Sequence, residues 1–106
     1  MNFKELKELN LSANGISDIS VLEKVKFEKL ENLYLRSNYI SNIKILKNVN
    51  IKELKELNLS DNDISDISVL EKVKFEKLEI LDLGDNKVDR NKFYYIINNL
   101  KYKIYI

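Results

Sequence analysis

Acidic side chains gather at two places in this sequence, and they are the first residues that could do chemistry. Asp61 and Asp63 flank an asparagine, and Asp82 and Asp85 stand close together further along the chain. Neighbouring carboxylates can bind Ca²⁺ or hydrolyse a glycosidic bond. The calcium-binding loop with its glycine and final glutamate is absent, however, and nothing indicates a pocket that would raise the pKa of one carboxyl group. We therefore expect no metal site, no cofactor and no catalytic residues.

The composition narrows the chemistry further. The 106 residues include no cysteine and no histidine, which removes thiol nucleophiles, zinc sites built on thiolates, and the commonest base at neutral pH. Lysine and arginine total 18 against 17 acidic residues, so a net charge of +1 predicts no general attraction for nucleic acid or membrane. With 44% hydrophobic and 33% charged residues, the sequence predicts one folded, non-enzymatic domain over residues 1–106.

A repeat of 24 residues organises the chain. Residues 4–31 recur as residues 52–79 with only two differences, at Ala13 and Gly15. Within this duplication, the pattern L-x-x-L-x-L-x-x-N-x-I/V occurs four times. Its alternating leucines predict one short strand per repeat, and because every strand is reached in the same direction, the strands must be parallel. The expected repeats are 6–29, 30–53, 54–77 and 78–101.

These four copies resemble the leucine-rich repeat family. The continuation I-x-x-I-x-x-L, as in Ile16, Ile19 and Leu22, is most similar to the repeat class of protein phosphatase 1 regulatory subunits and bacterial internalins. The resemblance implies an α/β fold, a right-handed leucine-rich repeat solenoid with a parallel sheet on the concave face and short helices or 3₁₀ turns on the convex face. It also implies that a partner lies on the concave sheet.

Two kinds of polar residue have structural roles in this interpretation. The asparagine of each copy is expected to bond to the backbone of its own and the adjacent coil; these are Asn14, Asn38, Asn62 and Asn86. On the convex side, Ser20 with Glu23 and Ser68 with Glu71 match a helix capping box. The second repeat carries Lys44 instead, so its convex turn is expected to be less sharply defined.

The two ends of the chain differ. After the fourth copy the repeat pattern is no longer followed. Residues 89–100 predict a longer amphipathic helix, and residues 101–106 predict a last strand. Together, residues 89–106 form the expected C-terminal helix-strand cap. Its tyrosines cover the solenoid end or, alternatively, form an aromatic binding spot; these are Tyr94, Tyr95 and Tyr105. The N-terminal end has no cap, because Phe3 aligns with the tail of a missing repeat. This open edge predicts a longer array or self-association.

The candidate binding residues lie between the strand leucines. Repeat two stands apart, because Tyr34, Arg36 and Tyr39 bring hot-spot residue types into one strand and its exit. Beside them lies an acidic half that favours a basic or mixed-charge protein or peptide. The full partner-binding prediction is Tyr34, Arg36, Tyr39, Asn58, Asp61, Asp82 and Asp85. The alternative that these are only solvated strand residues stays open.

The leading functional hypothesis is a non-catalytic protein-protein interaction module. Two alternatives remain: a structural spacer or array unit of a longer repeat protein, and a regulatory subunit of an enzyme such as a phosphatase. The charged start contains no apolar run long enough for a signal peptide, and no stretch has the length of a membrane span. The expected location is therefore cytoplasmic, unless the chain is a fragment of a secreted or surface protein.

Overall fold

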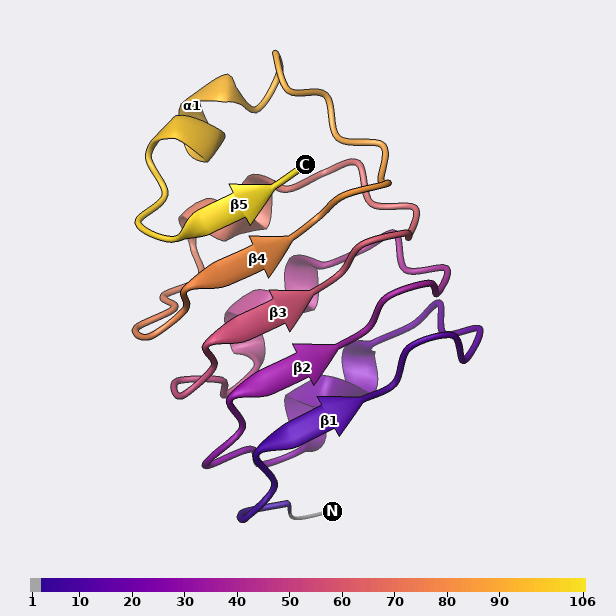
Figure 1. Cartoon of the computed structure of the whole chain (residues 1–106), viewed down its shortest axis with the longest axis vertical. Coiled ribbons are helices and arrows are strands. Elements are labelled where there is room, and N and C mark those ends of the chain that lie inside the picture. Colours follow the sequence, from indigo (N-terminus) through magenta and orange to yellow (C-terminus); the bar gives the residue numbers. More distant parts are fainter. Residues whose placement is uncertain (1–2) are drawn as a thin grey trace.

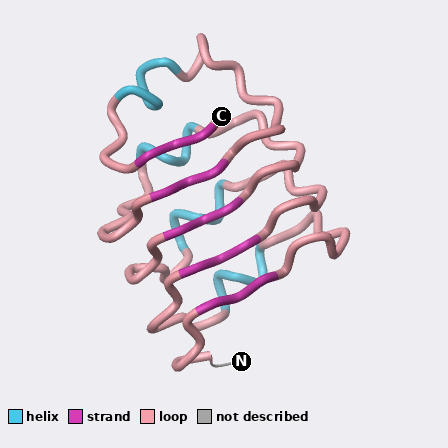
Figure 2. The backbone as a smooth tube through the Cα atoms, in the orientation of Figure 1, coloured by secondary structure: helices cyan, strands magenta, loops and turns pink. Residues whose placement is uncertain are grey.

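A computed structural model describes residues 3–106, which wind into a stack of coils (Figure 1). Each strand belongs to one sheet, and the chain returns behind that sheet through short helical turns (Figure 2). The strands are β1 (Glu8–Asn10), β2 (Asn32–Tyr34), β3 (Glu56–Asn58), β4 (Ile80–Asp82) and β5 (Lys103–Tyr105). The helical segments are the 3₁₀ turns η1 (Ser20–Lys24), η2 (Lys44–Asn48) and η3 (Ser68–Glu71), and the α-helix α1 (Tyr94–Asn98).

The strands pair in chain order, and every pair is parallel. Leu9 lies beside Leu33, and Leu33 lies beside Leu57, so equivalent residues of successive repeats form straight columns. Leu81 continues the column and pairs with Ile104 of β5. The predicted parallel solenoid and the predicted last strand are both confirmed.

The consensus leucines and isoleucines form a continuous core between the sheet and the turns. Leu33, Leu57 and Leu81 point inward from the strands and are 0% exposed, as are Ile40 and Ile64 on the way to the turns. Burying a side chain of this size contributes about 1.5–3 kcal/mol. Each of these residues packs against coils on both sides, so the stability of a coil depends on its neighbours.

The consensus asparagines link one coil to the next through their side-chain amides. Asn62 donates from Nδ2 to the carbonyl of Leu35 in the preceding coil and to that of Leu59 in its own coil, at 3.0 and 3.1 Å. Its Oδ1 accepts from the backbone N–H of Ile40 at 2.9 Å. Asn38 and Asn86 make the same kind of bonds. The predicted structural role is confirmed for Asn38, Asn62 and Asn86, whereas the side chain of Asn14 in the first coil donates only to the carbonyl of Ser12.

The convex turns form where they were expected, but the predicted capping boxes are wrong. No side chain caps η1 or η3 from its first residue. Instead, Asp18 Oδ1 accepts from the N–H of Ser20 and Asp66 Oδ1 accepts from that of Ser68, each at 2.9 Å. Asn42 does the same for Lys44, so η2 is as well formed as η1, against expectation. An aspartate or asparagine two residues before the turn competes successfully with the serine.

The C-terminal cap contains a shorter helix than predicted. Only Tyr94–Asn98 is α-helical, because turns precede it and two asparagines end it: Asn98 and Asn99 donate from their side chains to carbonyls four residues earlier. The apolar side of the segment is nevertheless inward, since Phe93 and Ile96 are buried. Within residues 3–106, every helix falls short of the length and apolar character that a bilayer span requires.

Among the residues that the structure describes, the N-terminal coil has a neighbouring coil on one side only. Leu9 and Leu11 are half-buried, whereas their equivalents Leu33 and Leu35 are 0% and 1% exposed. Phe3 stacks on Phe27, with ring centroids 6.3 Å apart, so it lies at the position expected for the tail of a repeat. Within residues 3–106, the first strand therefore lies at an edge of the sheet.

Candidate functional site

The outward side chains of the sheet form a surface that we call the sheet face. It consists of alternate strand residues, because successive side chains of a strand point to opposite sides. The parallel register aligns these residues in columns across the strands. The central column is Asn10, Tyr34, Asn58, Asp82 and Tyr105, and the entry column is Glu8, Asn32, Glu56, Ile80 and Lys103.

Tyr34 is the largest side chain in the middle of the sheet face. It is half-buried between Asn10 of β1 and Asn58 of β3. Desolvation raises the pKa of its hydroxyl, and the negative charges of Glu56 and Glu8 raise the pKa further. The hydroxyl is therefore protonated at neutral pH and can donate a hydrogen bond, while the ring offers apolar contact.

Arg36 lies one outward position beyond Tyr34, and its side chain is exposed. Its backbone carbonyl accepts from the N–H of Ala13, which fixes the main chain to the neighbouring coil at 2.9 Å. Among residues 3–106, no carboxylate forms an ion pair with its guanidinium. A rigid backbone thus presents a cationic group whose five donors are available to a partner.

The asparagine and aspartate side chains of the central column accept hydrogen bonds from the residue two positions further along the chain. Asn58 Oδ1 accepts from both the N–H and the hydroxyl of Ser60, at 2.9 and 2.6 Å. Asp82 Oδ1 accepts from the N–H of Gly84 at 2.9 Å. These side chains are consequently held in place, and their remaining polar atoms face outward with a fixed direction. Tyr34 replaces this local bond in repeat two, which is why its ring can stand free of its own strand.

The predicted acidic residues at the strand exits share an unusual backbone. Asp61 and Asp85 have φ angles of 53° and 54°, and Ser37 has 58° at the same position of repeat two. Asp tolerates this left-handed conformation better than most residues. The hydroxyl of Ser37 donates to Asp61 Oδ2 at 2.8 Å, so neighbouring exits are tied together. Asp85 is exposed.

Tyr39 lies beside the sheet face rather than on it. Its backbone N–H donates to the carbonyl of Ile16, and the equivalent residues Asp63 and Lys87 make the same kind of bond one and two coils further on. Asp63 and Lys87 form an ion pair at 3.5 Å, which shows that this column runs along the exit rim. The structure therefore places Tyr34 and Arg36 together on the sheet face and Tyr39, 66% exposed, on the rim.

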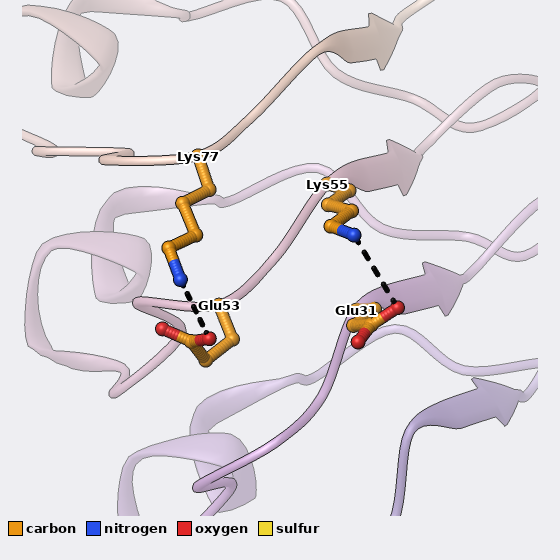
Figure 3. Close-up of polar contacts among 4 residues, drawn as sticks. All are labelled: Glu31, Glu53, Lys55 and Lys77. Atoms are coloured by element: carbon orange, nitrogen blue, oxygen red, sulfur yellow. Dashed lines mark hydrogen bonds and ion pairs between the residues drawn. The ribbon is translucent and has the colours of Figure 1, made fainter.

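Alternating charges run along the opposite rim, where the strands begin. Glu53 pairs with Lys77 at 2.9 Å, and Glu31 pairs with Lys55 at 3.8 Å (Figure 3). Glu5 pairs with Lys29 of the next coil in the same way. Because each of these charges is balanced by a neighbour, the entry rim gives the site little net charge. The charge preference of the surface comes instead from Arg36 and the aspartates of repeats three and four.

One residue of the sheet face, Lys103, was missed as a site candidate, and Tyr105 was considered only as part of the alternative aromatic spot of the cap. β5 adds Lys103 and Tyr105 to the entry and central columns, and the Lys103 ammonium lies 5.0 Å from the centroid of the Tyr105 ring. The signal was the alternation of residues 101–106, which requires these two side chains to point outward if the isoleucines point inward. Tyr94 and Tyr95 are also exposed and belong to α1 at the end of the stack, where Tyr94 lines a surface hollow together with Tyr105.

The chain is similar to known proteins in sequence pattern and in fold. A family model described as "Leucine Rich repeats (2 copies)" matches residues 4–48 and 52–92, which is more than half of the chain. No curated protein gives a significant match. A chain of the Drosophila melanogaster SNF/U2A' complex, solved by crystallography, is similar with a TM-score of 0.58 and 22% identity over 92% of this chain and 71% of that chain. At this identity the likeness concerns the fold alone.

Proposed function

Because the chain belongs to the leucine-rich repeat family, we propose that it is a non-catalytic interaction module that binds a protein or peptide through the sheet face. The observation that carries the proposal is the difference between repeat two and its neighbours. Repeats one and three have Asn and Ser where repeat two has Tyr34 and Arg36. An aromatic ring and a free guanidinium thus stand side by side among small polar side chains, and these are the residue types enriched in binding hot spots.

The backbone beneath these residues supports tight binding at low entropic cost. The asparagine bonds between coils and the in-register strands fix the sheet before any partner arrives. A partner therefore needs to order mainly the two long side chains, at about 0.5–1.5 kcal/mol for each that is immobilised. The same rigidity means that the spacing between columns selects what can bind.

The distribution of charge favours a partner of mixed charge. Arg36 is cationic, whereas Asp61, Asp82 and Asp85 lie on the side of β3 and β4. A segment that crosses the strands would place an acidic group near Arg36 and basic groups near the aspartates. This makes the expectation of a basic or mixed-charge peptide more specific. A cytoplasmic location for this chain and its partner is part of the same proposal.

Substitutions taken from the chain itself test the proposal. Tyr34→Asn with Arg36→Ser gives repeat two the residues of repeats one and three, so the fold should be unaffected. A hot-spot residue contributes about 2 kcal/mol or more, which corresponds to about 30-fold in affinity, so the double variant should lose at least that much. Affinity capture from the source cell, followed by mass spectrometry, compares the proteins retained by the wild type and by the double variant.

The matched control changes the same residue types elsewhere. Tyr95→Asn alters a tyrosine that is 82% exposed on α1, and Lys24→Ser removes a long cation from the end of η1. This control should retain the same proteins as the wild type. If the sheet-face variant also retains all of them while both variants fold normally, the sheet face is not the binding surface. In that case the spacer hypothesis, which the near-exact duplication favours, would explain the chain better.

A further inference from the structure

Both ends of the coil stack are sheet edges, and the two edges match each other. We propose that β5 of one copy pairs in parallel with β1 of a second copy, so that copies of this chain stack head to tail. The surface involved is separate from the sheet face, and the inference does not depend on the proposed function. It rests on the backbone ladder, the apolar side chains and one pair of charges at the two ends.

The N-terminal edge has the pattern of an interior coil that meets no neighbour among residues 3–106. Tyr34 and Arg36 accept at their carbonyls from the amides of Leu11 and Ala13 of the preceding coil. The equivalent carbonyls of the first coil belong to Asn10 of β1 and to Ser12 just after it, and they point to the open edge. The half-buried leucines of this coil lie behind them. The edge is thus prepared to accept hydrogen bonds and to bury apolar surface.

The C-terminal edge supplies the complementary groups. The N–H of Lys103 donates to Glu79 and the carbonyl of Tyr105 accepts from Leu83, so these two residues face β4. In a parallel ladder alternate residues face opposite edges, and therefore the N–H groups of Ile104 and Ile106 point away from β4. Both isoleucine side chains are half-buried, like the leucines of the first coil. Donors at one end of the chain thus match acceptors at the other.

Continuing the register across this junction pairs opposite charges. In the entry column, Lys103 follows Ile80, and the next position would be occupied by Glu8 of the second copy. Both side chains are exposed, and Lys103 forms no ion pair within residues 3–106. The same register sets Ile104 beside Leu9. The junction therefore repeats the arrangement inside the chain, with apolar side chains meeting in the core column and opposite charges meeting outside.

On the convex side, α1 lies at the junction. α1 precedes β5 in the chain and rises beyond it at the end of the stack (Figure 1). An α-helix with its side chains is about 10 Å wide, whereas neighbouring strands lie only about 4.8 Å apart. The helix is therefore wide enough to reach the level of the next strand, and the first coil of a second copy would pack against it on the convex side.

The size of the end predicts weak association. The two shorter dimensions of the molecule are 29 and 18 Å. An end of this size covers about 500 Å², which puts the junction at the lower limit of specific interfaces. We expect dissociation constants in the high micromolar range. Because each copy has one end of each kind, association should produce a series of lengthening chains rather than a closed dimer.

Charge reversal with rescue tests the head-to-tail junction. The mass distribution is measured by sedimentation equilibrium from about 10 µM to about 1 mM. We expect the wild type to lengthen with concentration, and Glu8→Lys or Lys103→Glu alone to weaken association about tenfold, since each places like charges at the junction. An equimolar mixture of the two variants should associate again, because the reversed charges of the two variants then meet with opposite signs. Lys47→Glu in η2, which makes the same charge change away from both ends, should behave as the wild type.

Three outcomes would overturn the proposal. A wild type that stays monomeric at the highest concentration shows that the charged edge residues protect the ends from pairing instead. Association that stops at a dimer and ignores Lys103→Glu points to two N-terminal edges meeting around a twofold axis. Single variants that associate like the wild type exclude this register. The sheet-face variant Tyr34→Asn with Arg36→Ser should leave association unchanged, which separates this result from the test of function.

Discussion

At the scale of single residues, Tyr102 is the least well satisfied side chain in the fold. Its hydroxyl is buried without a hydrogen-bond partner among residues 3–106. The ring itself packs well, edge-on against Phe75 with centroids 5.6 Å apart and planes at 89°. Burial raises the pKa of Tyr102 to about 12. The residue therefore combines a favourable ring contact with the cost of a desolvated polar group.

Tyr102→Phe should stabilise the protein, because it keeps the ring and removes only the hydroxyl. We expect a gain of about 1 kcal/mol in the free energy of unfolding at neutral pH. The gain should grow in alkaline solution, since the unfolded tyrosine loses its proton from its ordinary pKa of 10.0, whereas the folded one resists ionisation until about 12. The wild type thus loses stability as the pH rises through this window, and the variant does not.

Urea unfolding at about pH 7 and about pH 11 measures both effects. Tyr95→Phe, which removes a hydroxyl from an exposed ring on α1, is the control and should change little at neutral pH. A Tyr102→Phe variant less stable than the wild type would mean that the hydroxyl has a partner, such as a buried water.

At the scale of elements, the convex turns depend on a single acceptor placed two residues before each turn. Hydrogen bonds from Ser20 lower the pKa of Asp18, and those from Ser68 lower the pKa of Asp66. Repeat two uses Asn42, whose side chain does not ionise. The charged form of each aspartate is therefore favoured in the folded state, and only the first and third turns carry this dependence on pH.

Acid should weaken these two turns selectively. An aspartate whose pKa in the folded protein is below the ordinary value of 3.8 stabilises the fold at every pH above 3.8. This stabilisation is lost as the pH falls through the pKa of the folded state. Asp18→Asn with Asp66→Asn keeps an acceptor oxygen but removes the ionisation. We expect the wild type to be the more stable at about pH 7 and its advantage to shrink toward about pH 2, as measured by thermal unfolding.

Replacing the neutral residue provides the comparison for this experiment. Asn42→Asp should give η2 the acid sensitivity that η1 and η3 already have, while the stability at neutral pH is kept or raised. A constant difference between the wild type and the Asp18, Asp66 double variant across the whole pH range would contradict the interpretation.

The strands, turns and helix were predictable from the sequence to different degrees. The strands, their parallel order and the buried columns follow from a pattern repeated four times, so each prediction was supported by the others. The turn caps were mispredicted because Ser20 and Asp18 offer competing acceptors within two residues, and only the backbone geometry decides between them. The helix of the cap is shorter than predicted because the segment occurs only once, so no second copy supported its predicted bounds. Its asparagines end the helix through side-chain bonds that the spacing of apolar residues does not reveal.

The candidate site was predictable in part for a similar reason. The outward position of Tyr34 follows from strand alternation, and the structure places it on the sheet face. Tyr39 falls on the exit rim because the chain turns at Ser37, where φ is 58°, and this conformation is not encoded by the leucine pattern. Lys103 and Tyr105 entered the surface through pairing of β5, a contact that depends on how the cap folds back.

At the scale of the whole molecule, stability should depend on position along the stack. Asn62 bonds to the coil before it and to its own coil, and it is 6% exposed. Asn14 has the same consensus position in the first coil but is exposed, and its side chain donates only to the carbonyl of Ser12. Asparagines at the same position of the repeat therefore contribute unequally to the stability of the fold.

Asn62→Ala should cost much more stability than Asn14→Ala. The first change leaves the amide of Ile40 and several carbonyls buried without partners, for an expected loss of about 3 kcal/mol, whereas the second should cost less than about 1 kcal/mol. Urea unfolding of the two variants beside the wild type measures the difference. Equal losses would mean that the amides contribute only within their own coils, and the coupling between neighbours would have to come from the leucine columns alone.

The alternating charges of the entry rim make odd-numbered and even-numbered coils different. Since Glu5, Lys29, Glu53 and Lys77 alternate in sign from coil to coil, odd and even coils are not interchangeable. Removing a single coil would bring Glu5 against Glu53, whereas removing two would bring Glu5 against Lys77 and keep attraction throughout. The smallest segment that can be added or lost without electrostatic penalty is therefore a pair of coils. That pair has the length of the duplication in the sequence, so any lengthening or shortening of this solenoid should proceed by twos.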